Sequence, residues 1–232
     1  MNNVEPISLD VDTPQGPGRW LVSPTDGVPR MVLLLGHGAG GGLDGIDLVA
    51  LATLLPAHGI TVARFDQPWH VAGRRIAGRP DTLDQAWLAG VQQLTDDPNL
   101  GLTGLPRVVA GHSAGARVAC RTAGQVDASA VVGLSFPLHP PGKPDKSRLD
   151  ELLSPQVPVL VVQGERDPFG SADEVRTALA ASPAERAAGI QVVGVAGAAH
   201  ALGVPAKVRS APEHRQYLAD VVLPFLTALP GA

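Results

Sequence analysis

Short apolar runs alternate along the chain with segments in which apolar residues recur at helical spacing. The runs contain few polar residues, which is typical of strands buried on both faces of a parallel sheet. We therefore predict strands at residues 31–35, 60–65, 107–110, 130–134, 158–162 and 190–195. Between the runs, apolar residues three and four positions apart indicate amphipathic helices. Helices are predicted at residues 44–57, 81–94, 116–123, 171–181 and 213–229.

The start of the chain has a different pattern. Residues 6–11 and 19–22 flank a Pro/Gly-rich turn at 14–18, which predicts an antiparallel hairpin. Residues 66–80 and the Pro-rich segment 137–144 are expected to be irregular. Strands that alternate with helices after an antiparallel start predict an α/β fold with a mostly parallel, doubly wound sheet. We find no repeat or linker, so residues 1–232 are expected to form a single domain that binds ligands beyond the carboxyl ends of its strands.

Composition narrows the classes of function. Of the 232 residues, 44% are hydrophobic and 17% are charged, as in a globular protein. The net charge is −4 and no basic stripe is present, which argues against a nucleic-acid partner. Neither a signal peptide nor an apolar stretch of about 18 residues is found, so we expect a cytoplasmic protein without a membrane partner. Abundant Ala, Gly, Pro and Arg with few Lys suggests a bacterial source. The oligomeric state is not predicted.

Residues 111–115 read Gly-His-Ser-Ala-Gly and lie between a predicted strand and a predicted helix. In this G-x-S-x-G arrangement the serine occupies a strained turn that raises its hydroxyl above the sheet edge. Gly111 and Gly115 lack the Cβ atoms that would collide where the strand and the helix meet. A glycine-flanked serine that merely caps a helix is the alternative, and the strand before the motif argues against it. Ser113 is therefore the candidate nucleophile.

A serine hydroxyl needs a base to take its proton and an acid to orient that base. Asp167 directly follows the predicted strand at 158–162, and His200 directly follows the one at 190–195. The order Ser, Asp, His is the order of the α/β-hydrolase fold. Taken singly, Asp167 is a turn residue before a proline and His200 a loop histidine. Three such residues at three strand ends, in this order, predict a catalytic triad.

The glycine-rich loop at 36–42 follows the first parallel strand and is the second part of the predicted site. Tetrahedral intermediates of acyl transfer need two backbone N–H donors. We assign these to Ala114, which follows the nucleophile, and to Ala39, with Gly40 as the second choice. Gly38 and Gly40 are expected to contact substrate. His37 is expected to brace this loop.

Other histidines and an aromatic residue are weaker candidates. From its place in the turn, His112 is expected to point away from Ser113. Trp69 and His70 in the irregular segment are expected to line the substrate pocket, and His139 to lie near its mouth. Cys120, the single cysteine, excludes an internal disulfide and is expected to pack as a small buried residue. No metal-binding or nucleotide-binding signature other than the one below is found, so no metal or cofactor is predicted.

The same loop also allows a different class of function. Gly36, Gly38 and Gly41 match G-x-G-x-x-G, and Asp66 ends the following strand, as in a dinucleotide-binding oxidoreductase. That fingerprint usually opens its domain, whereas a hairpin precedes this one. It would also leave the Gly-His-Ser-Ala-Gly turn, Asp167 and His200 without a role. We rank this hypothesis well behind a hydrolase.

The motifs HGAGGG (37–42), GHSAG (111–115), QGERDPFG (163–170) and AAH (198–200) resemble those of the α/β-hydrolase superfamily. Residues 64–68 and 135–144 resemble a branch related to dienelactone hydrolases. That branch includes the hydrolase-like part of a non-specific-lethal complex subunit and a testis-expressed relative. Some of its members act in complexes without a known hydrolytic role.

The resemblance implies an α/β-hydrolase fold. We expect a minimal cap, because only about ten residues are expected between the strand that ends at Leu134 and the next helix. Together with the candidate residues it predicts a serine hydrolase of carboxylesterase type, whose partner is a small-molecule ester. The alternative that the resemblance leaves open is a hydrolase-like interaction protein with an idle triad.

Overall fold

Residues 5–25 and 27–230 are described by the structure, a computed structural model. Its centre is one sheet of eight strands. The strands are β1 (Ile7–Thr13), β2 (Gly16–Ser23), β3 (Met31–Gly36), β4 (Ile60–Asp66), β5 (Arg107–His112), β6 (Ala130–Leu134), β7 (Val159–Gly164) and β8 (Ile190–Val195). Their order across the sheet is β1-β2-β4-β3-β5-β6-β7-β8. The hairpin strands β1 and β2 pair antiparallel with each other and β2 with β4, whereas all other neighbours are parallel.

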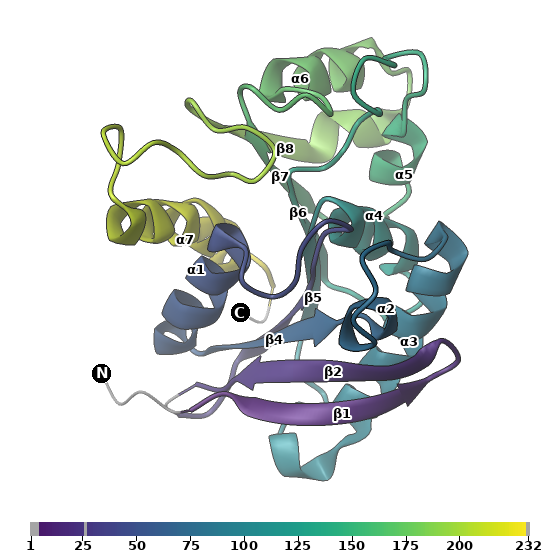
Figure 1. The fold of residues 1–232 in the computed structure, drawn as a ribbon. Coiled ribbons are helices and arrows are strands. Elements are labelled where there is room, and N and C mark those ends of the chain that lie inside the picture. The colour runs from purple at the N-terminus through teal and green to yellow at the C-terminus, as the bar shows by residue number, and fades with distance from the viewer. Residues whose placement is uncertain (1–4, 26, 231–232) are drawn as a thin grey trace.

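Helices cover both faces of this sheet (Figure 1). The α-helices are α1 (Ile46–Leu54), α2 (Pro68–Val71), α3 (Pro80–Asp96), α4 (Ala114–Thr122), α5 (Leu149–Leu153), α6 (Ala172–Ala181) and α7 (Ala211–Thr227). Short 3-10 helices occupy Leu55–His58, Pro98–Leu100 and Glu185–Gly189. The helices α1 and α7 lie side by side on one face, and α3, α4, α5 and α6 lie on the other. This is the predicted α/β-hydrolase fold, with its antiparallel N-terminal hairpin.

The central strands separate two apolar cores. Strand β3 shows why, because its successive side chains point to opposite faces. Val32 and Leu34 belong to the core under α3 and α4, and Leu33 and Leu35 to the core under α1 and α7. All four side chains have no exposed surface. The absence of polar alternation in the sequence run therefore reflects burial on both faces.

Several boundaries differ from the sequence prediction for local reasons. The hairpin turn is shorter than expected, because residues 16–18 already belong to β2. The helix predicted at 44–57 begins at Ile46 and becomes a 3-10 helix at Leu55, where Pro56 cannot donate a helical hydrogen bond. The helices α2 and α5 were not predicted. They have four and five residues, too few for a helical repeat of apolar positions to be recognised.

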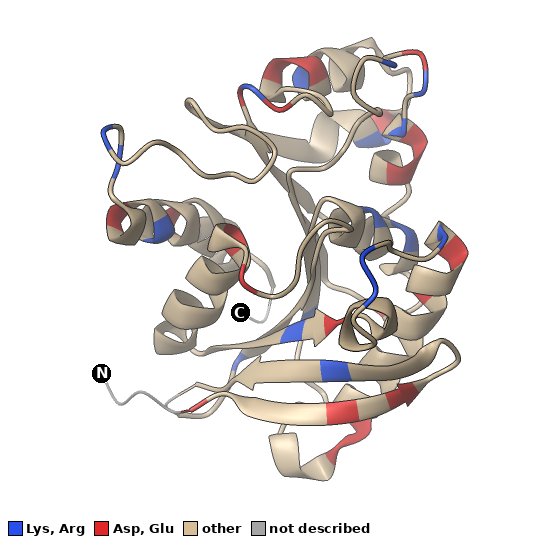
Figure 2. Ribbon diagram, in the orientation of Figure 1, with Lys and Arg blue, Asp and Glu red and all other residues tan. Residues whose placement is uncertain are grey.

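The connection between β6 and β7 is where many hydrolases would carry a cap, and here it contains only α5. Its Pro-rich part is tied down by Arg148, which donates a hydrogen bond to the carbonyl of Pro137 at 3.0 Å. The cap is therefore minimal, as expected. Charged residues lie mainly on helices and loops, and the central strands are almost free of them (Figure 2). Among the described residues, no helix combines the length and the hydropathy needed to cross a membrane.

The closest backbone packing lies where β3, β5 and α4 meet. A Cβ atom on Gly115 would collide with the carbonyl oxygen of Gly36, and one on Gly111 would lie 2.7 Å from the backbone nitrogen of Ala116. Neither neighbour is a flexible side chain, so the backbone itself would have to move. Glycine at 111 and 115 is therefore required by space, as the sequence motif suggested.

We predict that Gly115→Ala lowers the free energy of unfolding by about 3 kcal/mol, because an added methyl group has no room in this contact. Urea unfolding followed by circular dichroism measures the change. Gly124→Ala is the matched control, since a Cβ atom there would meet nothing within 4 Å. The control should change stability by no more than about 0.5 kcal/mol. Equal effects of the two substitutions would contradict this account of the packing.

Candidate active site

Ser113 lies at the carboxyl end of β5 and immediately precedes α4. Its backbone dihedral angles are φ 53° and ψ −108°, which residues other than glycine rarely adopt. The neighbouring strand holds this conformation in place, because the Ser113 N–H donates to the carbonyl of Leu134 at 2.9 Å. The serine is therefore half exposed at the sheet edge, on a strained strand-to-helix turn.

The structure brings Ser113, His200 and Asp167 into one chain of hydrogen bonds. His200 Nε2 lies 2.8 Å from Ser113 Oγ, and His200 Nδ1 lies 2.8 Å from Asp167 Oδ2. The Asp167 side chain is fully buried, while 23% of the His200 side chain is exposed. A carboxylate only accepts hydrogen bonds, so Nδ1 carries the proton and Nε2 presents its lone pair to the serine hydroxyl.

Further contacts orient the acid and the imidazole. Asp167 also accepts hydrogen bonds from Gln163 Nε2 at 3.1 Å and from the N–H of Phe169 at 2.9 Å. The Phe169 ring stacks on His200 with 4.2 Å between ring centroids. Gly164 allows the two loops to meet, since a Cβ atom there would lie 2.6 Å from the carbonyl oxygen of Ala199. The imidazole is thus held by a hydrogen bond at one nitrogen and by a ring on its face.

The glycine-rich loop is braced from below, as expected for His37. This fully buried imidazole pairs Nδ1 with the carbonyl of Gly38 at 2.8 Å, and its Nε2 accepts the N–H of Gln67 at 3.1 Å. Arg64 donates to the carbonyl of Leu43 at 2.7 Å. Burial lowers the pKa of the Arg64 guanidinium below its ordinary value. The two side chains therefore hold the backbone of the loop and of Leu43, which follows it.

Of the two residues assigned as oxyanion donors, Ala39 lies in this loop and Ala114 at the start of α4. Ala114 is the first residue of α4, so its N–H has no partner within the helix. Ala39 follows Gly38 in an exposed turn. Among the hydrogen bonds of the described residues, none uses the N–H of Ala39 or of Ala114. Both donors therefore remain available to a ligand.

A cavity of about 540 Å³ opens beside Ser113. It is lined by residues of the glycine-rich loop (Gly38, Ala39, Gly40, Gly41 and Gly42), of the start of α1 (Asp44, Gly45, Ile46, Asp47 and Leu48) and of the sheet edge and the loop beyond β8 (His112, Ser113, His200, Ala201 and Gly203). The predicted contacts Gly38 and Gly40 belong to it. The expectation that His112 points away from Ser113 is wrong, because its ring lines the same cavity and lies 5.3 Å from the His200 ring.

Trp69 does not reach this cavity. It lies on the other side of the glycine-rich loop, where a second space of about 10 Å³ touches Ala39, Ala114 and the buried Trp87. Nε1 of Trp87 and Oε1 of Gln67 are buried there without a hydrogen-bond partner in the described residues. A space of this volume holds about one water molecule.

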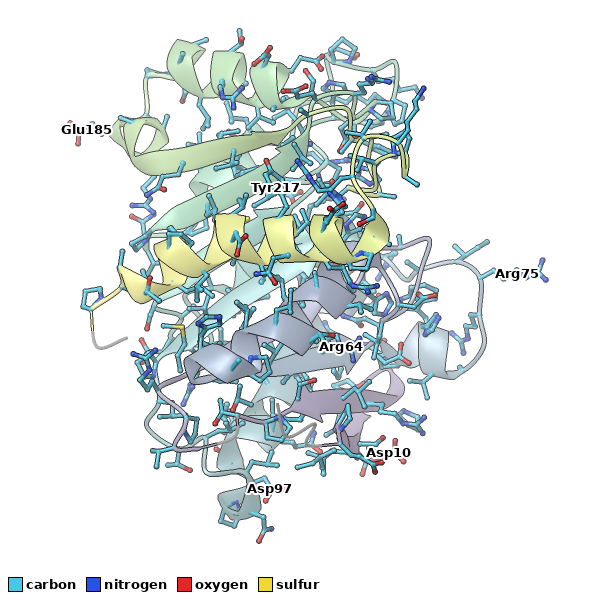
Figure 3. All side chains as sticks on the ribbon, turned by 90° about the vertical axis from the view of Figure 1, so that its left-hand side faces the viewer. Asp10, Arg64, Arg75, Asp97, Glu185 and Tyr217 are labelled. Atoms are coloured by element: carbon cyan, nitrogen blue, oxygen red, sulfur yellow. The ribbon has the colours of Figure 1, made fainter. Side chains whose placement is uncertain are left out.

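The other expected pocket residues also lie elsewhere. His70 packs on Gly42 from outside and donates from Nδ1 to Asp66 at 2.6 Å. His139 is a buried residue of the Pro-rich segment 137–144. Its Nδ1 lies 3.0 Å from the carbonyl of Pro140, and its Nε2 lies 3.5 Å from Glu174. Arg75, which follows α2 and was not assigned to the pocket above, projects away from the molecule (Figure 3). His70 lies on the short helix α2 and His139 in the Pro-rich segment, and the side-chain directions of both depend on packing.

His37, Asp66 and His70 offer three atoms within 4.8 Å of one another, an arrangement that can hold a metal ion. Existing hydrogen bonds already explain the cluster, since His37 Nε2 accepts the N–H of Gln67 and Asp66 accepts from His70. Burial alone would raise the pKa of Asp66, but the two histidines outweigh it and lower that pKa. These hydrogen bonds hold the cluster against the glycine-rich loop.

A second carboxylate–imidazole pair was missed by the sequence reasoning. His112 Nδ1 lies 2.7 Å from Asp47 Oδ2, and only 2% of the Asp47 side chain is exposed. Burial alone would lower the pKa of His112, but Asp47 outweighs it, with help from Asp167, so that the pKa is raised. Asp47 lies 65 residues before His112 along the chain, and no spacing in the sequence connects them.

The single thiol is not a competing nucleophile. Cys120 lies on α4 and is almost fully buried. Burial, with a smaller contribution from Glu151, raises the pKa of its thiol to about 12. At neutral pH the thiol is protonated and therefore unreactive.

Comparison with known proteins agrees with this architecture. Residues 29–226 match the model of a family described as an alpha/beta hydrolase domain, and the chain belongs to that family. A search of the curated proteins finds no match.

Solved structures with the same fold include three that cover nearly the whole chain. A serine hydrolase without a lid from Xanthomonas campestris has a TM-score of 0.72 and 20% identity, over 98% of this chain and 96% of that one. An alpha-beta serine hydrolase homologue from Coxiella burnetii has a TM-score of 0.73 and 16% identity, over 94% and 98%. A Pyrococcus furiosus esterase has a TM-score of 0.69 and 20% identity, over 97% and 90%. At these identities the likeness is one of fold.

We predict that the His112–Asp47 pair stabilises the folded protein more in acid than in alkali. A raised folded-state pKa contributes stability that is fully present below the unfolded-state pKa and is lost as pH rises through the folded-state pKa. Asp47→Asn should therefore lower the free energy of unfolding more at pH 5 than at pH 9. Urea unfolding at both values measures this difference.

The matched control is Asp173→Asn, because the Asp173 side chain is 90% exposed and, within residues 5–25 and 27–230, forms an ion pair only with Arg176. Its effect should be small at both pH values. If Asp47→Asn were equally destabilising at pH 5 and pH 9, Asp47 would not be the cause of the raised pKa of His112.

Proposed function

We propose that this α/β-hydrolase is a serine hydrolase of carboxylesterase type that cleaves a small carboxylic ester through an acyl-enzyme. The observation that carries the proposal is the continuous chain from Ser113 Oγ through His200 to Asp167, with 2.8 Å at each step, on a strained turn. The three residues come from the ends of three different strands. Nothing in packing alone requires a serine, a histidine and a buried carboxylate to align there.

Each residue has a defined part in the proposed reaction. His200 Nε2 takes the proton from Ser113 Oγ as the oxygen attacks the ester carbonyl. Asp167 holds the imidazole in the tautomer that can accept this proton and stabilises the positive charge that results. The N–H groups of Ala39 and Ala114 bind the oxyanion of the tetrahedral intermediate. They are backbone groups already in position, so little reorganisation accompanies the charge.

The second half of the reaction reuses the same groups. His200 gives the proton to the leaving-group oxygen, the C–O bond of the ester breaks and the alcohol departs. A water molecule then loses a proton to His200 and attacks the acyl-enzyme, and the acid leaves as Ser113 regains its proton. The minimal cap between β6 and β7 leaves the site accessible, which suits a small substrate.

The proposal extends to the branch of the superfamily. Residues 64–68 and 135–144 support a place in the branch related to dienelactone hydrolases and the non-specific-lethal complex subunit. In that branch some members have no known hydrolytic role, so an idle triad in an interaction protein is the rival. The aligned hydrogen bonds at Ser113 favour the enzyme.

The test of the proposal is covalent labelling. A fluorophosphonate probe should form one adduct per chain on Ser113, detected by intact mass and peptide mapping. Ser113→Ala should abolish both the adduct and the hydrolysis of p-nitrophenyl acetate, with its melting temperature nearly unchanged. An unlabelled wild-type protein that also fails to cleave esters would favour the idle scaffold. Undiminished turnover by Ser113→Ala would remove Ser113 from the mechanism.

We predict that Asp167→Asn and His200→Ala each lower kcat by about 10³-fold or more, because each leaves the serine without an oriented base. The residues act as one unit, so the double variant should be little slower than His200→Ala alone. Initial rates on p-nitrophenyl acetate, corrected for uncatalysed hydrolysis, measure this. Glu165→Gln, an exposed neighbour on the same loop, is the control and should retain activity. Fully additive losses would mean that Asp167 and His200 do not act on one proton.

A further inference from the structure

The cavity beside Ser113 has few polar side chains. Most of its wall is glycine, alanine, Ile46 and Leu48. Apart from Ser113 and His200, the polar side chains are Asp44, Asp47 and His112. Asp44 is exposed at the cavity edge, whereas only 2% of the Asp47 side chain is exposed. The reaction proposed above uses none of these three, so His112 is an unassigned polar group next to the nucleophile.

The ring of His112 is held by one nitrogen and leaves the other free. Nδ1 donates to Asp47, which also accepts the N–H of Leu48 at 2.9 Å and is thereby fixed at the start of α1. In the described part of the chain no hydrogen bond reaches Nε2, and this nitrogen is not sealed from solvent. A buried carboxylate that orients one ring nitrogen while the other faces a ligand is a common way to position an imidazole. His112 is therefore oriented for a ligand in the cavity.

The charges around His112 determine what kind of group it can bind. Asp47 cancels the charge of the protonated ring, while Asp167 behind His200 and Asp44 at the edge add negative charge. The start of α1 is visibly acidic (Figure 2). A carboxylate in the cavity would face these acids. A neutral hydroxyl would not, and it can accept from Nε2–H or donate to a bare Nε2, so it fits either protonation state.

The position of His200 determines which part of the ester enters the cavity. The leaving-group oxygen must reach His200 Nε2 to take its proton. His200, Ala201 and Gly203 line the large cavity, whereas His200 does not touch the small space beside Trp69. The alcohol portion of the ester therefore lies in the large cavity, in the company of His112.

We propose that His112, oriented by Asp47, is a specificity-determining residue that binds a hydroxyl group on the alcohol portion of the ester, so that the substrates are esters of polyhydroxy alcohols. This inference rests on the proposed esterase function and deepens it. Its consequence is a preference among esters that share one acyl group and differ only in the alcohol.

Matched acetate esters test this preference. In 4-hydroxybutyl acetate a terminal hydroxyl replaces the terminal methyl group of pentyl acetate, and 3-hydroxypropyl and butyl acetate form a shorter pair. The anion 4-acetoxybutanoate supplies the charged case. The wild-type protein should show kcat/KM at least about tenfold higher for the hydroxyl member of one pair, which is the effect of one hydrogen bond to a charged group. It should not favour the anion over pentyl acetate. Proton release in a pH-stat gives all rates without a chromophore.

Two substitutions at one position separate the free nitrogen from the bound one. His112→Asn places an amide near the position of Nδ1 and can keep the contact with Asp47, but it offers nothing at the position of Nε2. His112→Gln places its amide near the position of Nε2. The hydroxyl preference should fall to near one in His112→Asn and be partly restored in His112→Gln. A purely structural role would change the rates of both members of a pair equally and leave the ratio intact.

The outcomes distinguish this inference from the function on which it rests. If the wild type hydrolyses pentyl acetate but shows no hydroxyl preference, the inference is overturned and the esterase stands. A preference that persists in His112→Asn also overturns it. A preference for 4-acetoxybutanoate that is lost in His112→Asn would replace the hydroxyl with an anion and overturn the proposed substrate class. Absence of hydrolysis of every ester overturns both proposals, and absence of a wild-type preference overturns the inference even where a variant does not fold.

Discussion

The contact between the backbones of β3 and α4 is the constraint on which the site depends. Gly36 and Gly115 touch without side chains, and this closeness holds the glycine-rich loop against the turn that carries Ser113. The turn itself is strained, with φ 53° at Ser113, and persists because the N–H of Ser113 is bonded to Leu134 in the next strand. The strain places Ser113 at the sheet edge, and the contact holds the loop that carries Ala39 close to this turn. The position of Ser113 therefore depends on close backbone packing, which an added Cβ atom at Gly115 would disturb.

Two carboxylate–imidazole pairs lie side by side on this foundation, and they differ in what their free nitrogen faces. In the pair of Asp167 and His200 the free Nε2 meets Ser113 Oγ. In the pair of Asp47 and His112 it is left for the cavity. The rings are 5.3 Å apart at their centroids, so the imidazole that we propose as the base and the imidazole that we propose for recognition line one cavity.

The strands and the principal helices were predictable because burial on both sheet faces leaves continuous apolar runs, and amphipathic helices leave a clear repeat. The helices α2 and α5 were not predictable, since one turn of helix has no repeat to detect. Ser113, Asp167 and His200 could be named from the sequence because each lies just beyond the carboxyl end of a strand, and parallel strands end at one edge. His70 and His139 were expected at the pocket but are turned away from it by local partners, Asp66 and Pro140. Trp69 lines the smaller space beside Ala39 and Ala114.

The sequence by itself determined the class of fold, the strained turn and the three residues that meet at the sheet edge. These follow from local rules: the burial of strands, the need for glycine in a crowded turn, and the order of residues at strand ends. Only the tertiary structure decided that the His112 ring lines the cavity and that Asp47 holds it. Those features depend on contacts between residues far apart along the chain, such as the 65 positions between Asp47 and His112, and no local pattern in the sequence specifies such a contact.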